Sequence, residues 1–200
     1  MASLSVALLH YPVYNIDGEV IATSVTTLDL HDIARSCMTY GVERYYFVQP
    51  IPEMMELSRQ ILEYWSTGAG AVWRADRREA FTTVRLMETF EEAVGNLAEE
   101  EGAEPILVAT SARRFAGTVS YDKIRSLVRS PGRPILLLLG TGHGLTQEII
   151  DACDYILRPI RGGAEYNHLS VRSALAIMLD RIVGEPDGEG RAESERGTES

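Results

Sequence analysis

Two glycine-rich segments near the end of the chain have the residue types of a small-molecule site. Residues 140–145 (GTGHGL) follow an apolar strand expected at 135–139, and residues 161–168 (RGGAEYNH) lead into an amphipathic helix. Because glycine has no Cβ atom, the backbone amides of both segments can approach one ligand closely. The pair therefore predicts a binding site for a small molecule. Residues 140–144 alone also suit an ordinary turn between a strand and a helix.

Polar side chains in the same segments offer acid–base chemistry. His143 and His168 can each carry or release a proton near neutral pH, and Glu165 is a candidate base. Asn167 supplies a hydrogen-bond donor and an acceptor, which suits the orientation of a substrate group. Simpler interpretations stay open: both histidines as solvated loop residues, and Asn167 as the N-cap of the next helix.

An alternation of strands and helices must position these segments. Apolar, β-branched runs predict six strands, at residues 4–9, 45–48, 83–87, 106–109, 135–139 and 155–157. Apolar stripes of helical spacing predict helices between Asp29, as N-cap, and Gly41, and at 52–65, 90–98, 121–129, 146–153 and 169–183. Residues 67–78 are expected to be irregular. The pattern predicts an α/β domain: a mostly parallel six-stranded sheet with helices on both faces, whose ligands bind at the carboxyl ends of the strands.

Composition limits the class of protein and its partners. The 200 residues suit one domain, expected over residues 1–183, and the two cysteines, Cys37 and Cys153, are expected in the core. Residues 184–200 hold six acidic and two basic residues, so they carry −4 of the net charge of −10 and are expected to form a disordered acidic tail. Without a signal-peptide pattern or an apolar stretch of membrane-spanning length, the sequence predicts a soluble, cytoplasmic protein without membrane contact. No metal site is predicted.

Three segments, in this order, resemble the SPOUT class of S-adenosylmethionine-dependent RNA methyltransferases. Residues 29–42 (DLHDIARSCMTYGV) are similar to the early helix of its SpoU-like branch, where a glycine follows an arginine by six residues. Residues 135–145 (ILLLLGTGHGL) resemble the branch's apolar strand and glycine-rich loop. Residues 166–174 (YNHLSVRSA) resemble the loop that enters its last helix. The likeness extends over nearly all of the folded chain and is greatest to a small group without an accessory RNA-binding domain.

The resemblance implies a SPOUT fold with a C-terminal trefoil knot, and methyl transfer from S-adenosylmethionine to a nucleotide of tRNA or rRNA. It further implies a homodimer, and a separate RNA-binding protein is a candidate partner because positive charge is scarce. Arg35 and Asn167 are the predicted catalytic residues. The predicted cofactor contacts are Thr110, Ser111, Gly140, Thr141, Gly142, Gly144, Leu157, Ile160, Gly162, His168 and Leu169.

Arg35 is the residue that the resemblance assigns to substrate chemistry. A permanently charged guanidinium can hold a phosphate with two hydrogen bonds, or favour loss of a proton from a nearby hydroxyl. Its position beside the apolar stripe of the early helix favours a functional role. The alternative is a surface arginine paired with Asp29 or Asp32.

The net charge argues against a general attraction to RNA, so any RNA contact must be local. A candidate patch lies between the fourth and fifth expected strands and is joined by two later arginines; a solvated helix face explains it equally well. Its members are Arg113, Arg114, Lys123, Arg125, Arg129, Arg133, Arg158 and Arg161. The acidic composition also keeps a second function open: a non-catalytic module on the same scaffold that binds a nucleotide-like ligand or a protein.

Overall fold

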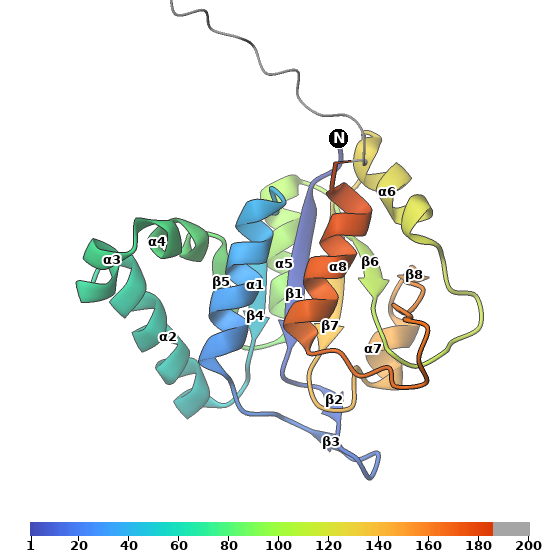
Figure 1. The fold of residues 1–200 in the computed structure, drawn as a ribbon, viewed down its shortest axis with the longest axis horizontal. Coiled ribbons are helices and arrows are strands. Elements are labelled where there is room, and N and C mark those ends of the chain that lie inside the picture. The colour runs from blue at the N-terminus through green and yellow to red at the C-terminus, as the bar shows by residue number, and fades with distance from the viewer. Residues whose placement is uncertain (186–200) are drawn as a thin grey trace, which may run out of the picture.

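The computed structural model describes residues 1–185, and these form one parallel sheet covered by helices (Figure 1). The sheet order is β5-β4-β1-β7-β6-β8, and every neighbouring pair is parallel. The strands are β1 (Leu4–Leu9), β4 (Tyr45–Val48), β5 (Val84–Met87), β6 (Ile106–Ala109), β7 (Ile135–Gly140) and β8 (Tyr155–Ile156). All six predicted strands are thereby confirmed. The predicted acidic tail lies outside the described residues from 186 onward.

The two central strands are buried along nearly their whole length. β1 and β7 pair from Leu4 opposite Ile135 to Leu9 opposite Gly140. Every residue of β1 is buried, as is every residue of β7 except Gly140. A continuous apolar run of this kind is typical of a parallel strand whose two faces are both covered. The central strands therefore hold the loops at their carboxyl ends on a rigid support.

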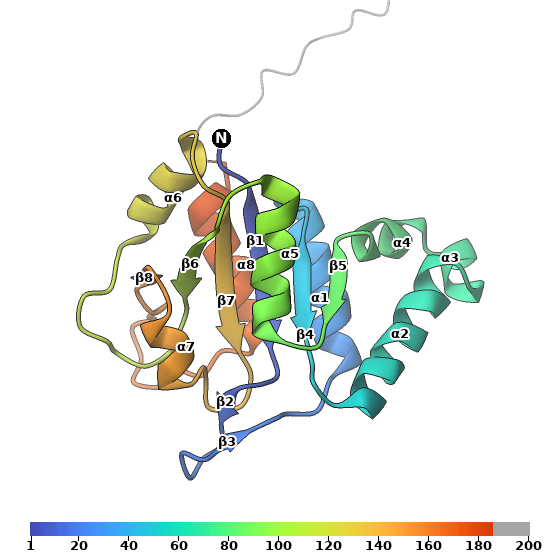
Figure 2. The same cartoon turned by 180° about the vertical axis from the view of Figure 1, so that it is seen from behind.

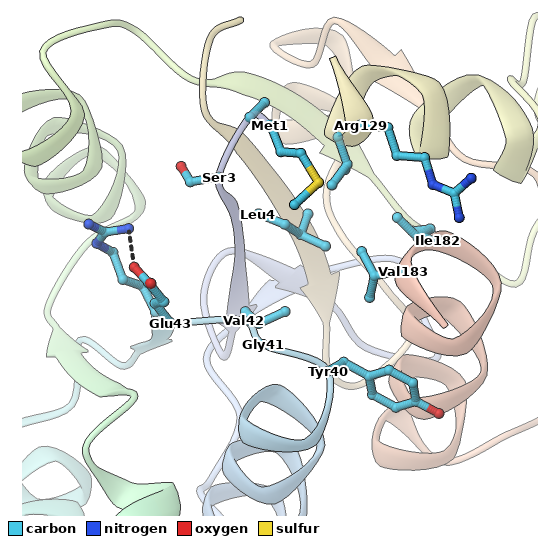
Figure 3. Close-up of a pocket in the computed structure, with 13 residues that line it drawn as sticks. Met1, Ser3, Leu4, Tyr40, Gly41, Val42, Glu43, Arg129, Ile182 and Val183 are labelled. Atoms are coloured by element: carbon cyan, nitrogen blue, oxygen red, sulfur yellow. Dashed lines mark ion pairs between the residues drawn. The ribbon is translucent and has the colours of Figure 1, made fainter. Parts of the chain in front are cut away.

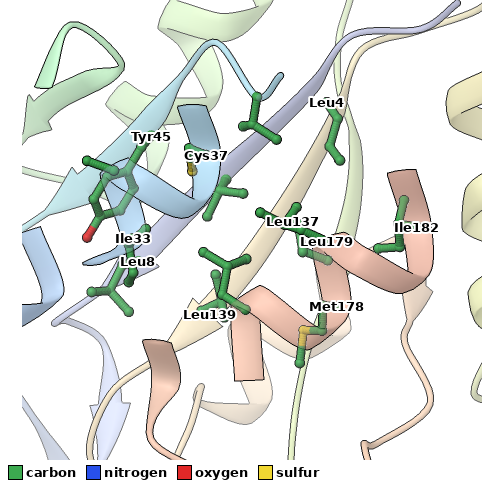
Figure 4. Packing of buried hydrophobic residues seen from close by; sticks show 14 of the residues in the cluster. Leu4, Leu8, Ile33, Cys37, Tyr45, Leu137, Leu139, Met178, Leu179 and Ile182 are labelled. Carbon is green, nitrogen blue, oxygen red and sulfur yellow. The ribbon is translucent and has the colours of Figure 1, made fainter. Parts of the chain in front are cut away.

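Helices cover both faces of the sheet, as the sequence predicts. The main helices are α1 (Thr27–Thr39), α2 (Pro52–Ser66), α5 (Phe90–Glu101), α6 (Tyr121–Arg129), α7 (Gln147–Asp151) and α8 (Val171–Val183). One apolar core joins α1, α6 and α8 to one face, and a second joins α5 and α7 to the other (Figures 1 and 2). In Figure 4, Ile33 and Cys37 of α1 and Leu179 and Ile182 of α8 point into the first of these cores. Within residues 1–185, no helix has the length and apolar character needed to cross a bilayer.

The start of α1 differs from the prediction. Its N-cap is Thr26, whose hydroxyl accepts a hydrogen bond from the backbone N–H of Asp29 at 3.2 Å. The Thr26 hydroxyl in turn donates to Asp29 Oδ2 at 2.7 Å. Asp29 therefore lies in the first turn, where its charge favours the helix N-terminus, and the prediction that it is the cap is wrong. The helix ends as predicted before Gly41, which has a φ of 68°.

Two further parts of the chain are ordered that the apolar pattern did not predict. Residues 67–78, expected to be irregular, contain α3 (Ala69–Trp73) and the first part of α4 (Ala75–Phe81), which lie with α2 beyond the edge strand β5 (Figure 1). A small antiparallel hairpin, β2 (Val13–Tyr14) with β3 (Val20–Ile21), follows β1. It lies at the carboxyl end of the main sheet, beside the loop after β7 (Figure 2).

Candidate functional site

Three neighbouring strands bring the predicted cofactor segments to the same end of the sheet. We call this end, where the carboxyl ends of the parallel strands lie, the carboxyl edge. β7, β6 and β8 are adjacent and parallel, so the chain leaves all three at the same end. Residues 140–145 follow β7, Thr110 and Ser111 follow β6, and residues 157–169 follow β8. The backbone N–H of Leu157 donates to Ala109 O at 2.8 Å, which ties two of these segments together. This edge is where parallel α/β sheets bind ligands.

The hairpin β2–β3 holds the glycine-rich loop through β2, where Val13 forms an antiparallel bridge with Leu145 and Tyr14 makes three hydrogen bonds. The backbone N–H of Tyr14 donates to Gly144 O at 3.0 Å, and the N–H of His143 donates to Tyr14 O at 2.8 Å. The N–H of Gln147, at the start of α7, donates to the Tyr14 hydroxyl at 3.1 Å. Sequence reasoning missed this element because its strands are too short for a periodic signal. The turn residues between Asn15 and Gly18 were the available clue.

The three glycines of the loop differ in their steric surroundings. A Cβ at Gly140 would lie 2.7 Å from the backbone N of Leu145, and one at Gly142 would lie 2.7 Å from Tyr14 O. Glycine is therefore required at position 140 because the loop closes on Leu145, and at position 142 because the hairpin approaches closely. Gly144 has a φ of 98°, and its nearest neighbour would be a guanidinium nitrogen of Arg113 at 3.9 Å. Its Cα therefore faces space that a ligand can enter.

Hydroxyl groups at this edge are already used within the chain. Thr141 Oγ1 lies 2.5 Å from Thr23 Oγ1 and donates to Leu9 O at 3.2 Å. Thr110 Oγ1 donates to Leu138 O at 2.9 Å, and Ser111 Oγ accepts from the backbone N–H of Arg113 at 3.1 Å. These side chains fix the loops, which leaves the backbone to meet a ligand.

The segment between β8 and α8 has backbone N–H and C=O groups that are free to bind a ligand. Within the described part of the chain, residues 159–169 make no backbone–backbone hydrogen bond, and residues 161–169 are exposed except for the half-buried Asn167. The Asn167 amide contacts Ala112 O at 3.5 Å. The N-cap of α8 is Ser170, so the interpretation of Asn167 as the cap is wrong. Unpaired amides and carbonyls next to the half-buried Ile160 suit a ligand with a polar rim and an apolar body.

Arg35 lies apart from these segments in its own subunit. It is exposed on α1, one turn beyond His31, whose ring packs against Trp65 of α2 and Phe81 of α4. Within residues 1–185, no hydrogen bond or ion pair connects Arg35 with the loops at the strand ends. The alternative interpretation, in which Arg35 pairs with Asp29 or Asp32, is wrong.

The two carboxylates pair with Arg172 of α8 instead. Arg172 contacts Asp29 Oδ1 at 2.8 Å and Asp32 Oδ2 at 3.3 Å. Arg172 therefore connects the first turns of α1 and α8, next to the segment that ends at Ser170. The charge of Arg35 stays available to a substrate.

The predicted basic patch divides into separate groups. Arg125 pairs with Asp122 at 2.6 Å, and Arg133 donates to the carbonyl of Glu104 at 2.8 Å. Arg113 donates to Leu145 O at 3.1 Å. The remaining arginines of the carboxyl edge line a cavity of about 330 Å³, whose lining residues are Arg114, Phe115, Thr118, Arg158, Pro159 and Arg161.

The SAM-dependent RNA methyltransferase family matches residues 3–184 by its sequence profile. The chain belongs to this family. An uncharacterized protein of Aquifex aeolicus is 42% identical over 177 residues, which cover 88% of this chain and 86% of that protein. A protein of Oleidesulfovibrio alaskensis named tRNA (guanine-N(1)-)-methyltransferase is 43% identical over 183 residues, or 92% of this chain. The chain spans only 42% of that relative's length.

Solved structures show the same fold at low sequence identity. A SpoU-type tRNA-modifying enzyme of Aquifex aeolicus has a TM-score of 0.56 and 15% identity, and the match covers 91% of this chain and 74% of that one. The SpoU methyltransferase AviRb of Streptomyces viridochromogenes, solved with AdoMet, has a TM-score of 0.54 and 16% identity, with 90% and 57% covered. The predicted fold class and family resemblance are confirmed. The trefoil knot stays a prediction.

S-adenosylmethionine is the methyl donor of this methyltransferase family, and the carboxyl edge fits such a group. Its adenosine part needs hydrogen bonds from backbone and an apolar wall, which residues 159–169 and Ile160 provide. Gly144, at the same end of the sheet, has an open side. Neither cysteine is suited to nucleophilic chemistry, because burial raises the pKa of both the Cys37 and the Cys153 thiol to about 12. Cys37 is buried and Cys153 half-buried, so the core prediction is confirmed for the first and holds in part for the second.

His10 is a residue of the methyltransferase domain that sequence reasoning missed. It follows β1 directly, is fully buried, and its Nδ1 lies 3.2 Å from Val48 O. Burial lowers the pKa of the imidazole to about 4, so the ring is neutral at physiological pH. Its backbone carbonyl accepts from the N–H of Thr23, the residue that contacts Thr141 of the glycine-rich loop. Only burial, which a sequence does not display, distinguishes this histidine.

A second cavity, of about 370 Å³, lies at the opposite end of the sheet (Figure 3). It is lined by the start of β1 and by the ends of α1, α6 and α8, including Met1, Leu4, Tyr40 and Ile182. The only charged side chains among its lining residues are Glu43, Arg44 and Arg129, and the first two pair at 3.7 Å. It is thus separate from the carboxyl edge and from every predicted cofactor residue.

Proposed function

We propose that the methyl donor binds where the chain leaves β7, β6 and β8, and that RNA approaches this edge from the solvent side. The observation that carries the proposal is the unpaired backbone of residues 159–169, which the parallel strands β7, β6 and β8 place at the same end of the sheet as the open side of Gly144. Backbone of this kind is stable in water only because it is exposed, and it can exchange water for a ligand.

In this proposal the backbone and the apolar side chains divide the work of binding. The backbone groups of residues 140–144 and 160–169 hydrogen-bond the adenosine part. Leu157, Ile160 and Leu169 cover its apolar faces, and His168 borders the site. Thr110 and Ser111 close the side next to β6. When bound, S-adenosylmethionine would supply a methyl group on a sulfonium, whose thioether is a leaving group that needs no further activation. The chain's tasks are then to align the acceptor, to exclude water and to help remove a proton from the acceptor.

Asn167 and Arg35 are assigned to the RNA substrate. Asn167 lies in the segment after β8, and its amide can orient the acceptor group. Arg35 is exposed, and within residues 1–185 it forms no ion pair with a carboxylate and no hydrogen bond or ion pair with the site of its own subunit. We therefore assign the site's arginine to a second copy of the chain: in a homodimer, the partner subunit's Arg35 meets the RNA. Leu175, Met178 and Leu179 of α8 are buried in the core of one chain and are not available as dimer contacts.

The name of the Oleidesulfovibrio relative does not define the acceptor atom. More than half of that protein lies outside the match, since the chain spans 42% of its length. We propose RNA methylation, with tRNA as the first substrate to test, and leave guanine N1 as one acceptor among others. The cytoplasm, where such RNA is found, is the proposed location.

A calorimetric titration of S-adenosylmethionine tests the cofactor site with two neighbouring glycines. A Cβ at Gly162 or Gly163 would meet no atom within 4 Å, and neither residue has a positive φ, so Gly162→Val and Gly163→Val should both fold. Gly162 is the predicted contact. We expect micromolar binding to the wild type, a loss of about tenfold or more in Gly162→Val, and little change in Gly163→Val. Absence of binding to the folded wild-type protein would contradict the proposal.

A further inference from the structure

Three arginines converge on the cavity of about 330 Å³ beside β6 and β8. Arg114 comes from the segment after β6, and Arg158 and Arg161 from the segment after β8. Pro159, between the latter two, limits the backbone freedom of that segment. We call this group, Arg114, Arg158 and Arg161, the arginine pocket.

The charges of the arginine pocket are not neutralised by the protein. Within residues 1–185, five other arginines form ion pairs with carboxylates, but none of these three does; the paired ones are Arg44, Arg59, Arg74, Arg125 and Arg172. The cavity lining contains no acidic residue. Like charges that face one cavity repel each other, and the chain as a whole carries −10. An anion in the cavity would relieve this repulsion.

The lining indicates which anion fits. A guanidinium binds a phosphate through two parallel hydrogen bonds, and three of them form a site for a phosphodiester rather than for a single small carboxylate. Phe115 adds an aromatic ring to the same cavity, and the Arg113 guanidinium lies 5.5 Å from the centre of that ring. Arginines alternating with an aromatic ring are typical of sites that hold single-stranded nucleic acid by backbone and base together.

We propose that the arginine pocket binds a phosphate of the RNA strand next to the nucleotide that receives the methyl group, and that Phe115 stacks on the adjoining base. The placement rests on the proposed function, because Ile160, assigned to the cofactor, lies between Arg158 and Arg161 in the chain. RNA can thus bind an acidic protein locally, without an accessory domain. The long basic patch considered from the sequence reduces to this pocket.

Fluorescence anisotropy with a labelled ten-residue oligouridylate tests the pocket, with calorimetry of S-adenosylmethionine alongside. The variants are Arg114→Gln, Arg158→Gln and Arg161→Gln. Arg129→Gln is the matched control, since Arg129 is exposed, forms no ion pair within residues 1–185 and lines the cavity at the opposite end of the sheet. Each pocket variant should weaken RNA binding about fivefold at low salt and reduce the slope of log affinity against log salt by about 0.7. The control should change neither, and Arg114→Gln, Arg158→Gln and Arg129→Gln should bind S-adenosylmethionine as the wild type does.

A second variant separates stacking from charge. Phe115→Leu keeps an apolar side chain in the half-buried position and should weaken oligouridylate binding about fivefold or more without changing the salt slope. Three results would overturn the proposal: equal losses in Arg129→Gln, no RNA binding by the wild type, or a loss of S-adenosylmethionine affinity in Arg114→Gln and Arg158→Gln. The last would make the pocket a site for the cofactor's carboxylate. Failure of the proposed function shows differently, as absent cofactor binding with RNA binding retained.

Discussion

At the scale of single residues, His10 shows how burial alone can change the chemistry of a side chain. The ring packs against Phe47 in a tilted arrangement with 4.5 Å between ring centres, and burial lowers the pKa of the imidazole from the ordinary value of 6.5 to about 4. The backbone carbonyl of the same residue accepts from the N–H of Thr23, whose hydroxyl contacts Thr141 of the glycine-rich loop. Protonation of the ring is therefore expected to weaken the fold from the end of the sheet that carries the proposed site.

The pH dependence of stability tests this state of His10. Below pH 6.5 the His10 imidazole of the unfolded chain binds a proton, whereas that of the folded chain stays neutral until about pH 4. The free energy of unfolding therefore falls as the pH drops through this window, by up to about 3 kcal/mol from His10 alone, and is unaffected by it above pH 6.5. Urea denaturation at pH 7, 6 and 5 should show a shallower decline for His10→Gln than for the wild type. Parallel curves would contradict a buried neutral histidine.

At the scale of elements, Arg172 connects α1 and α8 at the ends nearest the proposed site. Its two carboxylate partners differ in exposure: the exposed fraction of the side chain is 8% for Asp29 and 45% for Asp32. A pair with a buried carboxylate is costly to break, whereas a pair with an exposed one contributes little. The connection to Asp29 is therefore the one that fixes α8, and with it the segment that ends at Ser170.

Double-mutant cycles distinguish the two ion pairs. Arg172→Gln should lower the free energy of unfolding by about 2–3 kcal/mol, because within residues 1–185 it leaves the buried Asp29 carboxylate with only the Thr26 hydroxyl as a hydrogen-bond partner. The coupling energy of Arg172→Gln with Asp29→Asn should exceed about 1 kcal/mol, and that with Asp32→Asn should stay below about 0.5 kcal/mol. Similar coupling in both cycles would show that burial does not decide the strength of this contact.

At the scale of the whole molecule, the proposed function requires two chains. Arg35 and Asn167 lie on parts of one subunit that no described contact connects, although both are assigned to the RNA. Sedimentation equilibrium should therefore give a dimer of the 22.1 kDa chain. A monomer at micromolar concentration would remove the basis for assigning Arg35 to the partner's site.

Mixing two defective variants tests the shared site directly. Arg35→Gln and Asn167→Ala should each reduce methyl transfer to bulk tRNA by about 100-fold while S-adenosylmethionine binding is kept. If the arginine acts on the partner's site, random exchange of subunits restores one intact site in each mixed dimer, and the mixture should regain about a quarter of wild-type activity. If both residues act within one subunit, the mixed dimers hold no intact site. Activity no greater than that of either variant would then be observed.

Several parts of the fold could be predicted from local sequence, and others could not. The six strands and most helices were correct because burial on both faces leaves long apolar runs, and burial on one face leaves a helical stripe. Asp29 was misassigned as a cap because Thr26, Thr27 and Asp29 are all suitable residues near the start of the helix. Which of them is used depends on where the chain arrives from the hairpin, which no local pattern contains.

The sequence by itself determined the two glycine-rich segments, the strand ends that carry them and the family resemblance. Only the tertiary structure decided which of these parts meet. The contact of Tyr14 with Gly144 joins residues about 130 positions apart, the pairing of Asp29 with Arg172 joins residues 143 apart, and the arginine pocket forms only because β6 and β8 are neighbours. Local patterns reflect the burial of each residue on its own element. Contacts between distant residues depend on strand order, which is set by the packing of the whole chain.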